Sequence, residues 1–451
     1  MTVTSTATGT VLITGATGFL GGHLVDGCLR EGHRVRALVR PGSDTARLRS
    51  LPGVDLVPGD LADAASLRRA AEGCDTVLHS AARVVDHGTR AQFQQANVTG
   101  TRLLLSAARA AGAGRFVFVS SPSALMRLRE GDRLGVDEST PYPERFFNHY
   151  CATKAAAERE VLASGGAGFT TVAVRPRGIW GPRDQAGFLP RLTAAMRAGR
   201  LPDLSGGKRV LVSLCHVDNA VHACLRAAAA PAERVSGKAY FVADREVTDL
   251  WAFLARVADL AGCAPPGPRI PLPVSRALAA TAETLWRLRP GPPVSTPPLT
   301  RYMLALLTRS TTYDTTAAHQ DLAYDPPRTQ QSGLRTLFAP APETTNASPH
   351  PTAPAGTSAD APAGTRTTDA DADAASGAAG SRPTARAGTP ADAVTDAGTC
   401  PTASATASAG TRAEADAGPR PTGPAGARAD ATEPAAAPRP TAFAEALPLI
   451  P

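Results

Sequence analysis

The sequence predicts an α/β protein, in which a doubly wound parallel sheet of the Rossmann type precedes a smaller, mainly helical C-terminal lobe and a disordered tail. Strand-like and helix-like segments alternate up to about residue 180. The strand-like segments are apolar throughout, as buried parallel strands are, and a glycine-rich turn follows the first of them. We therefore expect a dinucleotide-binding domain over residues 1–180, a substrate-binding lobe over 181–338 and the tail over 339–451.

The elements of the first part follow one another with short connections. Each expected strand is a short apolar run, and each expected helix has apolar residues at helical spacing or is rich in alanine. The expected strands are 10–13, 35–39, 54–57, 76–78, 116–119 and 171–174. The expected helices are 19–30, 64–71, 92–111 and 150–163.

Beyond Gly181 the alternation weakens and helices dominate. They are expected over 189–198, 219–228, 248–261, 274–289 and 300–307, with proline-rich linkers between several of them. The last two could pack in a core, line an apolar substrate cleft or touch a membrane surface. Their large apolar residues include Leu285, Trp286, Tyr302, Met303, Leu306 and Leu307.

The tail and the overall composition exclude several kinds of protein. Phe443 is the only aromatic residue after Phe338, so the tail has too little apolar surface to offset its ordering entropy. The net charge of +7 comes from scattered arginines, which indicates a solvated basic surface and no nucleic-acid partner. The seven cysteines form no CxxC pair, which favours a reducing cytoplasm and no metal. No apolar run predicts export or a membrane span.

The segment TGATGFLG, residues 14–21, carries the signal for a cofactor. Gly15 permits a tight turn, Gly18 lets a pyrophosphate approach the backbone at a helix N-terminus, and Gly21 lets the helix pack closely on the strand. Three glycines can also mean only a turn, but the strand before them and the helix after them favour dinucleotide binding. The cofactor contacts expected from the same segment are Thr17, Phe19 and Leu20.

Residues after the second strand bear on the choice of cofactor. A carboxylate there would bind the ribose hydroxyls of NAD, whereas this chain has Arg40, with Ser43 nearby. A cation suits a 2′-phosphate, so we expect NADP, with NAD as the alternative. Arg40 as an ordinary surface residue is the other interpretation.

Two further strand ends complete the expected cofactor site. Asp60 and Leu61 follow the third strand, where the carboxylate either accepts from the adenine amino group or forms an Asx turn or helix cap. Ala81 and Ala82 follow the fourth strand, where small residues let the backbone meet the cofactor.

Tyr150 and Lys154 form a YxxxK motif, and Ser120 and Ser121 end the strand 116–119. Positions i and i+4 share a helix face, so the ammonium can stabilise the phenolate and make the tyrosine a useful acid or base near neutrality. A strand-terminal hydroxyl can hydrogen-bond a substrate carbonyl. The alternatives are a packed tyrosine with a surface lysine, and a serine that satisfies loop backbone.

Together these residues resemble the extended short-chain dehydrogenase/reductase family over residues 10–335. The resemblance implies Tyr150 as the acid/base, Lys154 as its partner, Ser121 as the carbonyl-binding hydroxyl and Asn97 as part of a proton relay. It also implies that Pro176 and Ile179 border the nicotinamide. The motifs that carry it, in order, are TGATGFLG, GDLAD, HSAA, NVTGT, VSSPSAL, YCATK and RPRGIWGP.

Within that family the sequence is most similar to 3β-hydroxysteroid dehydrogenases and the related sterol-carboxylate dehydrogenases, through RPRGIWGPRD and the segment 206–220. Members that act on nucleotide sugars usually carry an arginine six residues before the aspartate of that segment. Here Val212 precedes Asp218, which counts against a diphosphate substrate. Asp218 itself is expected to cap the following helix, and His216 to be packed.

The resemblance implies hydride transfer between NADP(H) and a secondary alcohol or ketone on a bulky apolar substrate, steroid-like or polyketide-like. The alternatives are a reductase of dihydroflavonols or 2-alkyl-3-oxoalkanoates, a sugar-nucleotide epimerase or dehydratase, and a non-catalytic dinucleotide sensor. The resemblance also suggests a homodimer. We expect a cytoplasmic protein, with peripheral membrane contact left open.

Overall fold

The computed structural model describes residues 9–85, 88–288 and 299–339. The predicted disordered tail, apart from Ala339, lies outside the described residues. Among the described residues, no helix combines the length and the apolar character that crossing a membrane requires.

A seven-stranded sheet forms the centre of the described chain, in the order β12–β7–β5–β4–β1–β2–β3. Every pairing in it is parallel. The strand order reverses between β1 and β4, which is where doubly wound sheets bind dinucleotides. Its strands are β1 (Thr10–Thr14), β2 (Arg34–Val39), β3 (Val54–Pro58), β4 (Thr76–His79), β5 (Arg115–Val119), β7 (Thr170–Pro176) and β12 (Lys238–Val242).

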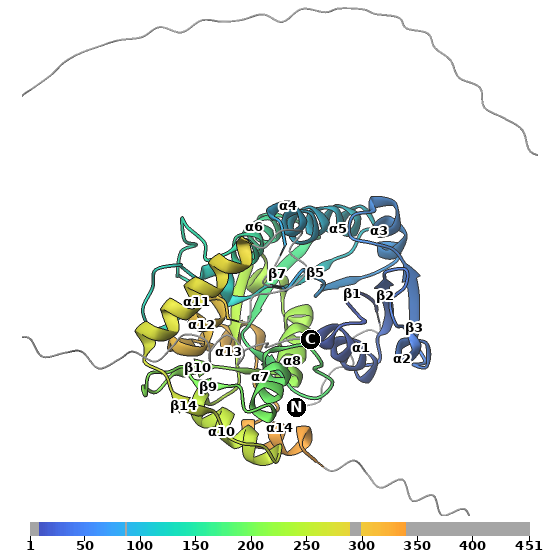
Figure 1. Cartoon of the computed structure of the whole chain (residues 1–451). Helices are drawn as coiled ribbons and strands as arrows, with labels where there is room; N and C mark the ends of the chain where they lie inside the picture. The colour runs from blue at the N-terminus through green and yellow to red at the C-terminus, as the bar shows by residue number, and fades with distance from the viewer. Residues whose placement is uncertain (1–8, 86–87, 289–298, 340–451) are drawn as a thin grey trace, which may run out of the picture. The chain divides into compact units, whose positions relative to one another are not determined.

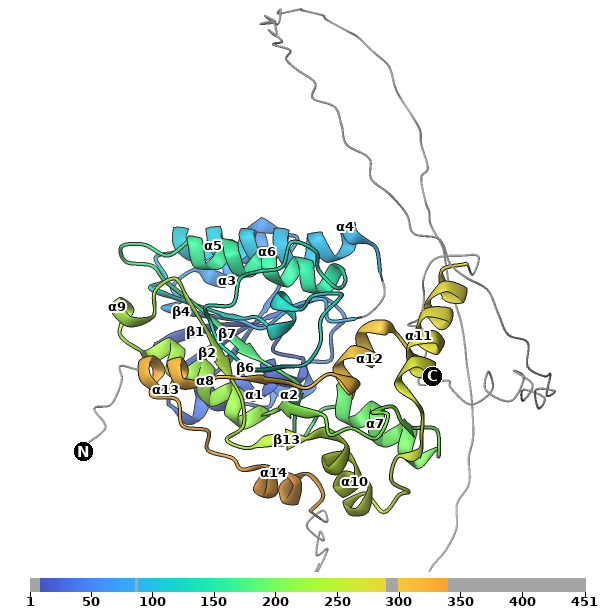
Figure 2. The ribbon, with the colours of Figure 1, turned by 90° about the vertical axis from the view of Figure 1, so that its left-hand side faces the viewer.

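Helices cover both faces of this sheet (Figures 1 and 2). One layer packs around buried Leu67, Leu104 and Phe116, and the other around buried Leu24 and Val221. The first layer is α3 (Ala64–Ala71), α5 (Gly100–Ala110) and α6 (His149–Ala163). The second is α1 (Phe19–Arg30), α8 (Val217–Ala229) and α13 (Thr316–Leu322), and α2 (Ala46–Arg49) and α9 (Ala232–Val235) are short connecting helices. The predicted fold class is confirmed.

The helix predicted over 92–111 is present, but its path is not uniform. A π-helical turn at Gln94–Thr99 joins α4 (Arg90–Phe93) to α5. Such turns inside α-helices occur frequently at functional sites. This one carries Asn97, whose buried side chain faces the proposed catalytic helix α6.

The lobe is mainly helical, as predicted, and has its own core around Trp180, Val212 and Trp251. Its helices are α7 (Phe188–Arg197), α10 (Leu250–Leu260), α11 (Leu272–Arg287), α12 (Arg301–Thr308) and α14 (Gln330–Leu337). A four-stranded sheet accompanies them, in the order β13 (Val247–Asp249), β10 (Leu211–Ser213), β15 (Thr311–Tyr313) and β6 (Arg133–Val136). The remaining short strands are β8 (Ile179–Trp180), β9 (Pro202–Asp203), β11 (Cys215–His216) and β14 (Gly267–Arg269).

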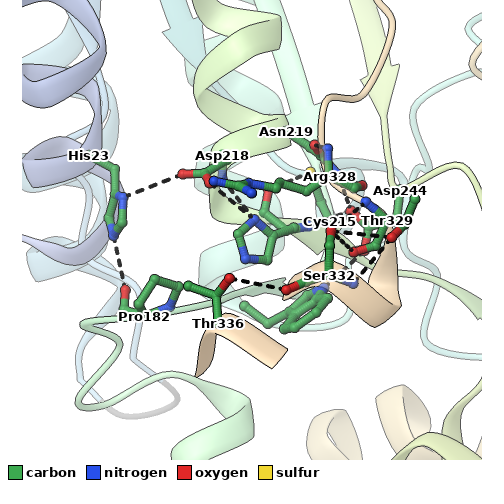
Figure 3. A network of polar contacts seen from close by, with 12 residues as sticks. His23, Pro182, Cys215, Asp218, Asn219, Asp244, Arg328, Thr329, Ser332 and Thr336 are labelled. Atoms are coloured by element: carbon green, nitrogen blue, oxygen red, sulfur yellow. Dashed lines mark hydrogen bonds and ion pairs between the residues drawn. The ribbon is translucent and has the colours of Figure 1, made fainter. Parts of the chain in front are cut away.

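A polar network ties the start of the sheet domain to the segment before α14 (Figure 3). His23 Nδ1 lies 3.8 Å from Asp218 Oδ1, and Arg328 donates from Nε to Oδ2 of the same carboxylate at 2.9 Å. The prediction that Asp218 caps α8 is wrong. His216 precedes the helix, and its Nδ1 accepts from the backbone N–H of Asp218 at 3.2 Å, so Asp218 already lies in the first turn. His216 is packed, as predicted, with its ring centroid 4.8 Å from that of Trp180.

Candidate active site

The candidate site lies at the edge of the main sheet where four of its strands end. Because β1, β4, β5 and β7 are parallel, their carboxyl ends meet there. The chain that leaves these ends contains most of the residues that the sequence singles out, whereas Asn97, Tyr150 and Lys154 lie on helical segments and Arg40, Asp60 and Leu61 follow β2 and β3. Those at the strand ends are the glycine turn at 15–21, residues 80–82, residues 120–125 and residues 176–179.

The glycine turn has the shape of an anion cradle. Gly15 has a φ of +74°, and its carbonyl accepts from the N–H of Gly18 at 2.9 Å. A Cβ at Gly21 would lie 2.0 Å from that carbonyl oxygen, so only glycine allows α1 to pack this closely. Helix α1 begins without a side-chain cap and has no acidic residue in its first turn, which leaves its first N–H groups for an anion. The pyrophosphate of a dinucleotide fits these donors.

The other predicted contacts in this turn differ in exposure. Thr17 and Gly18 are exposed, whereas Phe19 and Leu20 are half-buried at the start of α1. The backbone of Ala81 closes the opposite side, because a Cβ on Gly15 would come within 3.0 Å of the N atom of Ala81. Ala82 follows, half-buried, and both alanines stay predicted cofactor contacts.

The residues predicted at the adenine end lie after β2 and β3. Arg40 is exposed, and it forms no ion pair within the described part of the chain. Asp60 Oδ1 accepts from the N–H of Ala62 at 2.8 Å, which is an Asx turn, and Asp63 caps α3. Leu61 is half-buried against Gly100 of α5. The Asx turn gives Asp60 a structural role, the residue is exposed, and the contact with adenine stays a prediction.

His79, at the end of β4, links two neighbouring elements of the site through its imidazole. Its Nδ1 lies 2.7 Å from Thr14 Oγ1 and its Nε2 lies 2.9 Å from Thr101 Oγ1. Burial, together with the nearby charge of Lys154, lowers its pKa to about 3. The imidazole therefore stays neutral at physiological pH and acts as a bridge between β1 and α5.

Lys154 is the most unusual charge in the site. It is only 3% exposed, and its Nζ donates to the carbonyl of Val119 at 2.7 Å and lies 4.7 Å from the ring centroid of Phe118. Burial lowers its pKa to about 8, while the carboxylate of Glu158 opposes that shift. The ammonium is thus fixed at the end of β5, two residues before Ser121.

Tyr150 and Ser121 lie on two elements that pack against each other at this edge of the sheet. Tyr150 stands one turn before Lys154 on α6 and is buried with Phe93 and Cys151, with Met126 packed against them. Ser121 is half-buried at the start of a 3₁₀ helix (Pro122–Leu125) that packs against α6, and its Oγ accepts from the N–H of Ser123 at 3.2 Å. The hydroxyl of Ser120 is buried, with no hydrogen-bond partner among the described residues.

Asn97 connects α6 to the chain after β4. Its Oδ1 accepts from the N–H of Arg83 at 2.7 Å, and its Nδ2 donates to Thr153 Oγ1 at 3.1 Å and to the carbonyl of Arg83 at 3.2 Å. These bonds fix the position of α6 relative to the π-helical turn. The predicted relay role for Asn97 stays a prediction.

Pro176 and Ile179 lie after the Ser–Tyr–Lys set, at the end of β7. Pro176 is the last, buried residue of the strand and pairs with Val242 of β12. Ile179 is half-buried in β8 and pairs with Cys215. Both sit at the edge predicted to meet the nicotinamide.

Helix α12 of the lobe reaches across to this edge. The hydroxyl of Tyr302 lies 2.8 Å from Ser123 Oγ, and its ring packs against Phe147 with centroids 5.5 Å apart. Met303, Leu306 and Trp286 are half-buried and Leu307 is buried, whereas Leu285 of α11 is 61% exposed. Of the apolar residues that the sequence offered for a substrate cleft, Tyr302 therefore contacts the site directly.

A small cavity next to Ser123 is lined by charged side chains that the sequence does not mark as functional. Arg133, Arg177 and Arg309 line it, with Glu130. Arg177 could have been found, because it follows a predicted strand end within RPRGIWGP. The other two come from distant segments, and no local pattern marks them.

A Rossmann sheet with an uncapped glycine turn and a Ser–Tyr–Lys set on elements that pack at the same edge defines a dinucleotide-dependent oxidoreductase of the extended short-chain dehydrogenase/reductase type. The model of the 3-beta hydroxysteroid dehydrogenase/isomerase family matches residues 12–274. The chain belongs to this family, whose members are nicotinamide-dependent oxidoreductases acting on CH–OH groups.

Two curated relatives are named as ketone reductases. The chain is 39% identical, over 75% of its length and 98% of the relative's, to a 4-hydroxy-2-methyl-3-oxo-4-farnesyl-3,4-dihydroquinoline-1-oxide ketoreductase of Stigmatella aurantiaca. It is 38% identical, over 73% and 98%, to a 2-alkyl-3-oxoalkanoate reductase of Stenotrophomonas maltophilia. Among solved structures, MoeE5 in complex with UDP-glucose and NAD is 26% identical with a TM-score of 0.55, covering 73% of this chain and 97% of that one.

Proposed function

We propose that the protein transfers hydride between NADP(H) and a ketone or secondary alcohol group on a bulky, mainly apolar substrate. The observation that carries the proposal is the buried ammonium of Lys154, fixed at the end of β5 on the same helix face as Tyr150. Burying an ammonium costs free energy. A lysine with only a structural role would therefore not need to be buried here, and its burial favours a functional role.

The residues divide the work of proton transfer. When bound, the nicotinamide supplies or accepts the hydride. Tyr150 donates its phenol proton to the carbonyl oxygen in reduction and takes it back in oxidation, and Lys154 stabilises the phenolate. Ser121 donates a hydrogen bond to the same oxygen and polarises the carbonyl. Asn97 holds α6 in place through its hydrogen bond to Thr153. It would also take part in the relay that returns a proton to Tyr150.

The cofactor assignment rests on the glycine turn and on Arg40. The free N–H groups of α1 suit the pyrophosphate, and an exposed cation directly after β2 suits a 2′-phosphate. NAD is the alternative, and MoeE5 binds it. Asp60, Leu61, Ala81 and Ala82 would contact the adenosine and pyrophosphate parts.

The apolar surroundings of Tyr150 favour a hydrophobic substrate. Phe93, Met126, Phe147 and Tyr302 surround the tyrosine, and they offer an apolar wall to the reacting carbon. Ketones of the two classes named in the relatives, a farnesylated dihydroquinoline oxide and a 2-alkyl-3-oxoalkanoate, are leading candidates, and a 3β-hydroxysteroid is the other.

A sugar-nucleotide substrate is disfavoured by one residue. Val212, at the position where nucleotide-sugar enzymes usually place an arginine, is wholly buried in the lobe core. A dinucleotide sensor is disfavoured as well, because it has no need of the buried lysine.

The proposal is tested by following the absorbance of the reduced nicotinamide ring, at about 340 nm, with NADPH and with NADH. The substrate panel contains 2-alkyl-3-oxoalkanoates, an apolar cyclic ketone, 3β-hydroxysteroids and UDP-glucose. Turnover of a ketone or hydroxysteroid, with none of UDP-glucose, supports it. Nucleotide binding without turnover of any panel member contradicts it.

A further inference from the structure

The cavity beside Ser123 is small, and its lining begins at Pro122, directly after the proposed carbonyl-binding residue Ser121. It has a volume of about 40 Å³ and is bounded by the 3₁₀ helix after Ser121, by residues 130–136, by Arg177 and by the end of α12 with β15. A buried water needs at least about 10–15 Å³ of such space. The cavity therefore has room for a few waters or one carboxylate group, and not for a ring system.

The charged side chains that line the cavity carry an excess of positive charge, because three arginines face one glutamate. Arg133 Nη1 pairs with Glu130 Oε1 at 3.0 Å, which neutralises one of the three guanidinium groups. Within the described chain, Arg177 and Arg309 form no ion pair. Arg177 donates to the carbonyls of Thr311 and Leu306, both at 3.4 Å, and Arg309 donates to the carbonyls of Arg127 and Leu128 at 3.3 and 3.1 Å.

Two guanidinium groups are thus held around a confined space without a direct ion pair among the described residues, and Glu130 is the one acidic residue of the lining. Both side chains are only partly exposed, and burial lowers the pKa of Arg309, while the nearby carboxylates of Glu130 and Asp132 oppose that shift. Each guanidinium has five N–H donors, so backbone carbonyls leave donors to spare. A planar carboxylate matches such a fork with two parallel hydrogen bonds.

We infer that this cavity receives an acidic group of the ketone substrate, a carboxylate placed close to the reacting carbonyl. Ser123 lines the cavity and lies two residues after Ser121, so one molecule can present its carbonyl to Ser121 and its acid to Arg177 and Arg309. The inference rests on the proposed function, because it specifies the substrate of the same site.

The experiment uses the full chain with a matched pair of substrates, 3-oxodecanoate and 3-oxodecanamide, which differ in charge at one end. Values of kcat/KM are measured for the parent protein, for Arg177→Met and Arg309→Met, and for Arg245→Met as a control. Arg245 is an exposed arginine that pairs with Asp325 outside the cavity. Calorimetry with decanoate, decanamide and inorganic phosphate measures binding apart from turnover.

The inference predicts that the parent protein prefers the acid at least about tenfold. Each cavity variant should lower kcat/KM for the acid about 10–100-fold, which is the loss expected for one charge-assisted contact, and change the amide value by less than about threefold. Arg177→Lys, which keeps the charge, should recover part of the preference, and Arg245→Met should leave both values unchanged. Decanoate affinity should follow the same pattern.

Three outcomes would overturn the inference. They are equal use of the acid and the amide by the parent protein, equal losses on both substrates in the cavity variants, and phosphate binding as tight as decanoate binding. If no ketone is reduced at all, the proposed function fails, and the decanoate titrations then decide the inference alone. If the ketones are reduced without regard to charge, the proposed function stands and the inference falls.

Discussion

The carboxylate of Glu158 accepts two hydrogen bonds from the guanidinium of Arg175, at 2.7 and 2.9 Å, and both side chains are almost wholly buried. Tyr142 donates a third bond to the same carboxylate at 2.5 Å. Glu158 lies one turn beyond Lys154 on α6, and Arg175 lies on β7, so the pair fixes α6 to the sheet.

Removing one partner of this ion pair should destabilise the protein strongly. Glu158→Gln leaves a buried guanidinium uncompensated, and we expect the free energy of unfolding to fall by about 3–5 kcal/mol. Glu160→Gln is the matched control on the same helix, because Glu160 pairs with the exposed Arg102. That change should cost less than about 1 kcal/mol. Urea unfolding measures both, and equal losses in the two variants would show that the buried pair has no special role.

The pH dependence of activity should report the buried lysine. Its pKa is lowered to about 8, so Lys154 loses its proton as the pH rises through that value and no longer supports the phenolate. In the free enzyme, kcat/KM should therefore fall above about pH 8. Because Glu158 raises this pKa, Glu158→Gln should move the fall to lower pH, whereas Lys238→Met, at the surface, should not. A profile that stays flat to pH 10 in the parent protein would be incompatible with this role.

The lowered pKa of Lys154 also makes the free energy of unfolding depend on pH. This quantity should rise with pH, whereas kcat/KM should fall. The folded pKa lies below the ordinary value of 10.5, so the cost of burying the charged lysine is present below about pH 8 and disappears as the pH rises toward 10.5. The contribution of Lys154 to the free energy of unfolding should rise over that window. Comparing the parent protein with Lys154→Met across it isolates this contribution, and parallel curves would contradict the shift.

The glycine turn should tolerate no side chain at its third glycine. In Gly21→Ala the new Cβ would lie 2.0 Å from the carbonyl oxygen of Gly15, so α1 must move away from the turn. We expect the dissociation constant for the reduced nicotinamide nucleotide to rise at least about tenfold, since the N–H donors move with the helix. Gly166→Ala, where a Cβ meets nothing within 4 Å, is the control. Fluorescence titration measures both, and unchanged affinity in Gly21→Ala would remove this helix from the cofactor site.

Arg40 should decide the cofactor preference. In Arg40→Asp a carboxylate replaces the exposed cation after β2, which repels a 2′-phosphate and suits free ribose hydroxyls. The ratio of kcat/KM with NADPH to that with NADH should fall at least about tenfold. Arg34→Asp, exposed at the other end of the same strand, should leave the ratio unchanged. An unaltered ratio in Arg40→Asp would mean that position 40 does not meet the nucleotide.

Much of the fold could be predicted because its signals are local. Continuous apolar runs mark the buried parallel strands, and α1 and α3 have the predicted bounds because helical spacing sets them. Strand β12 is missing from the predicted strands although its apolar run at 239–242 carries the same local signal; its place beside β7, more than 60 residues earlier, comes only from the tertiary structure. The cap of α8 was mispredicted because the helix begins one residue before Asp218, and a histidine took the place of the expected acidic cap.

The candidate site shows the same division. The glycine turn and the YxxxK helix are local motifs, and the parallel sheet brings them to one edge. The contacts that fix them are not local. The bond from Lys154 to Val119, the bridge through His79 and the arginines of the cavity join residues 20 to 180 positions apart, and only the tertiary structure supplies them.

We propose that Tyr150 moves the proton, whereas the glycine turn binds the nucleotide. The most direct test measures turnover and nucleotide affinity together in Tyr150→Phe, which removes one hydroxyl and keeps the packing against Phe93 and Met126. We predict that turnover falls by about 10²–10⁴-fold while the dissociation constant for the nucleotide changes less than about twofold. Full turnover in Tyr150→Phe would contradict the account.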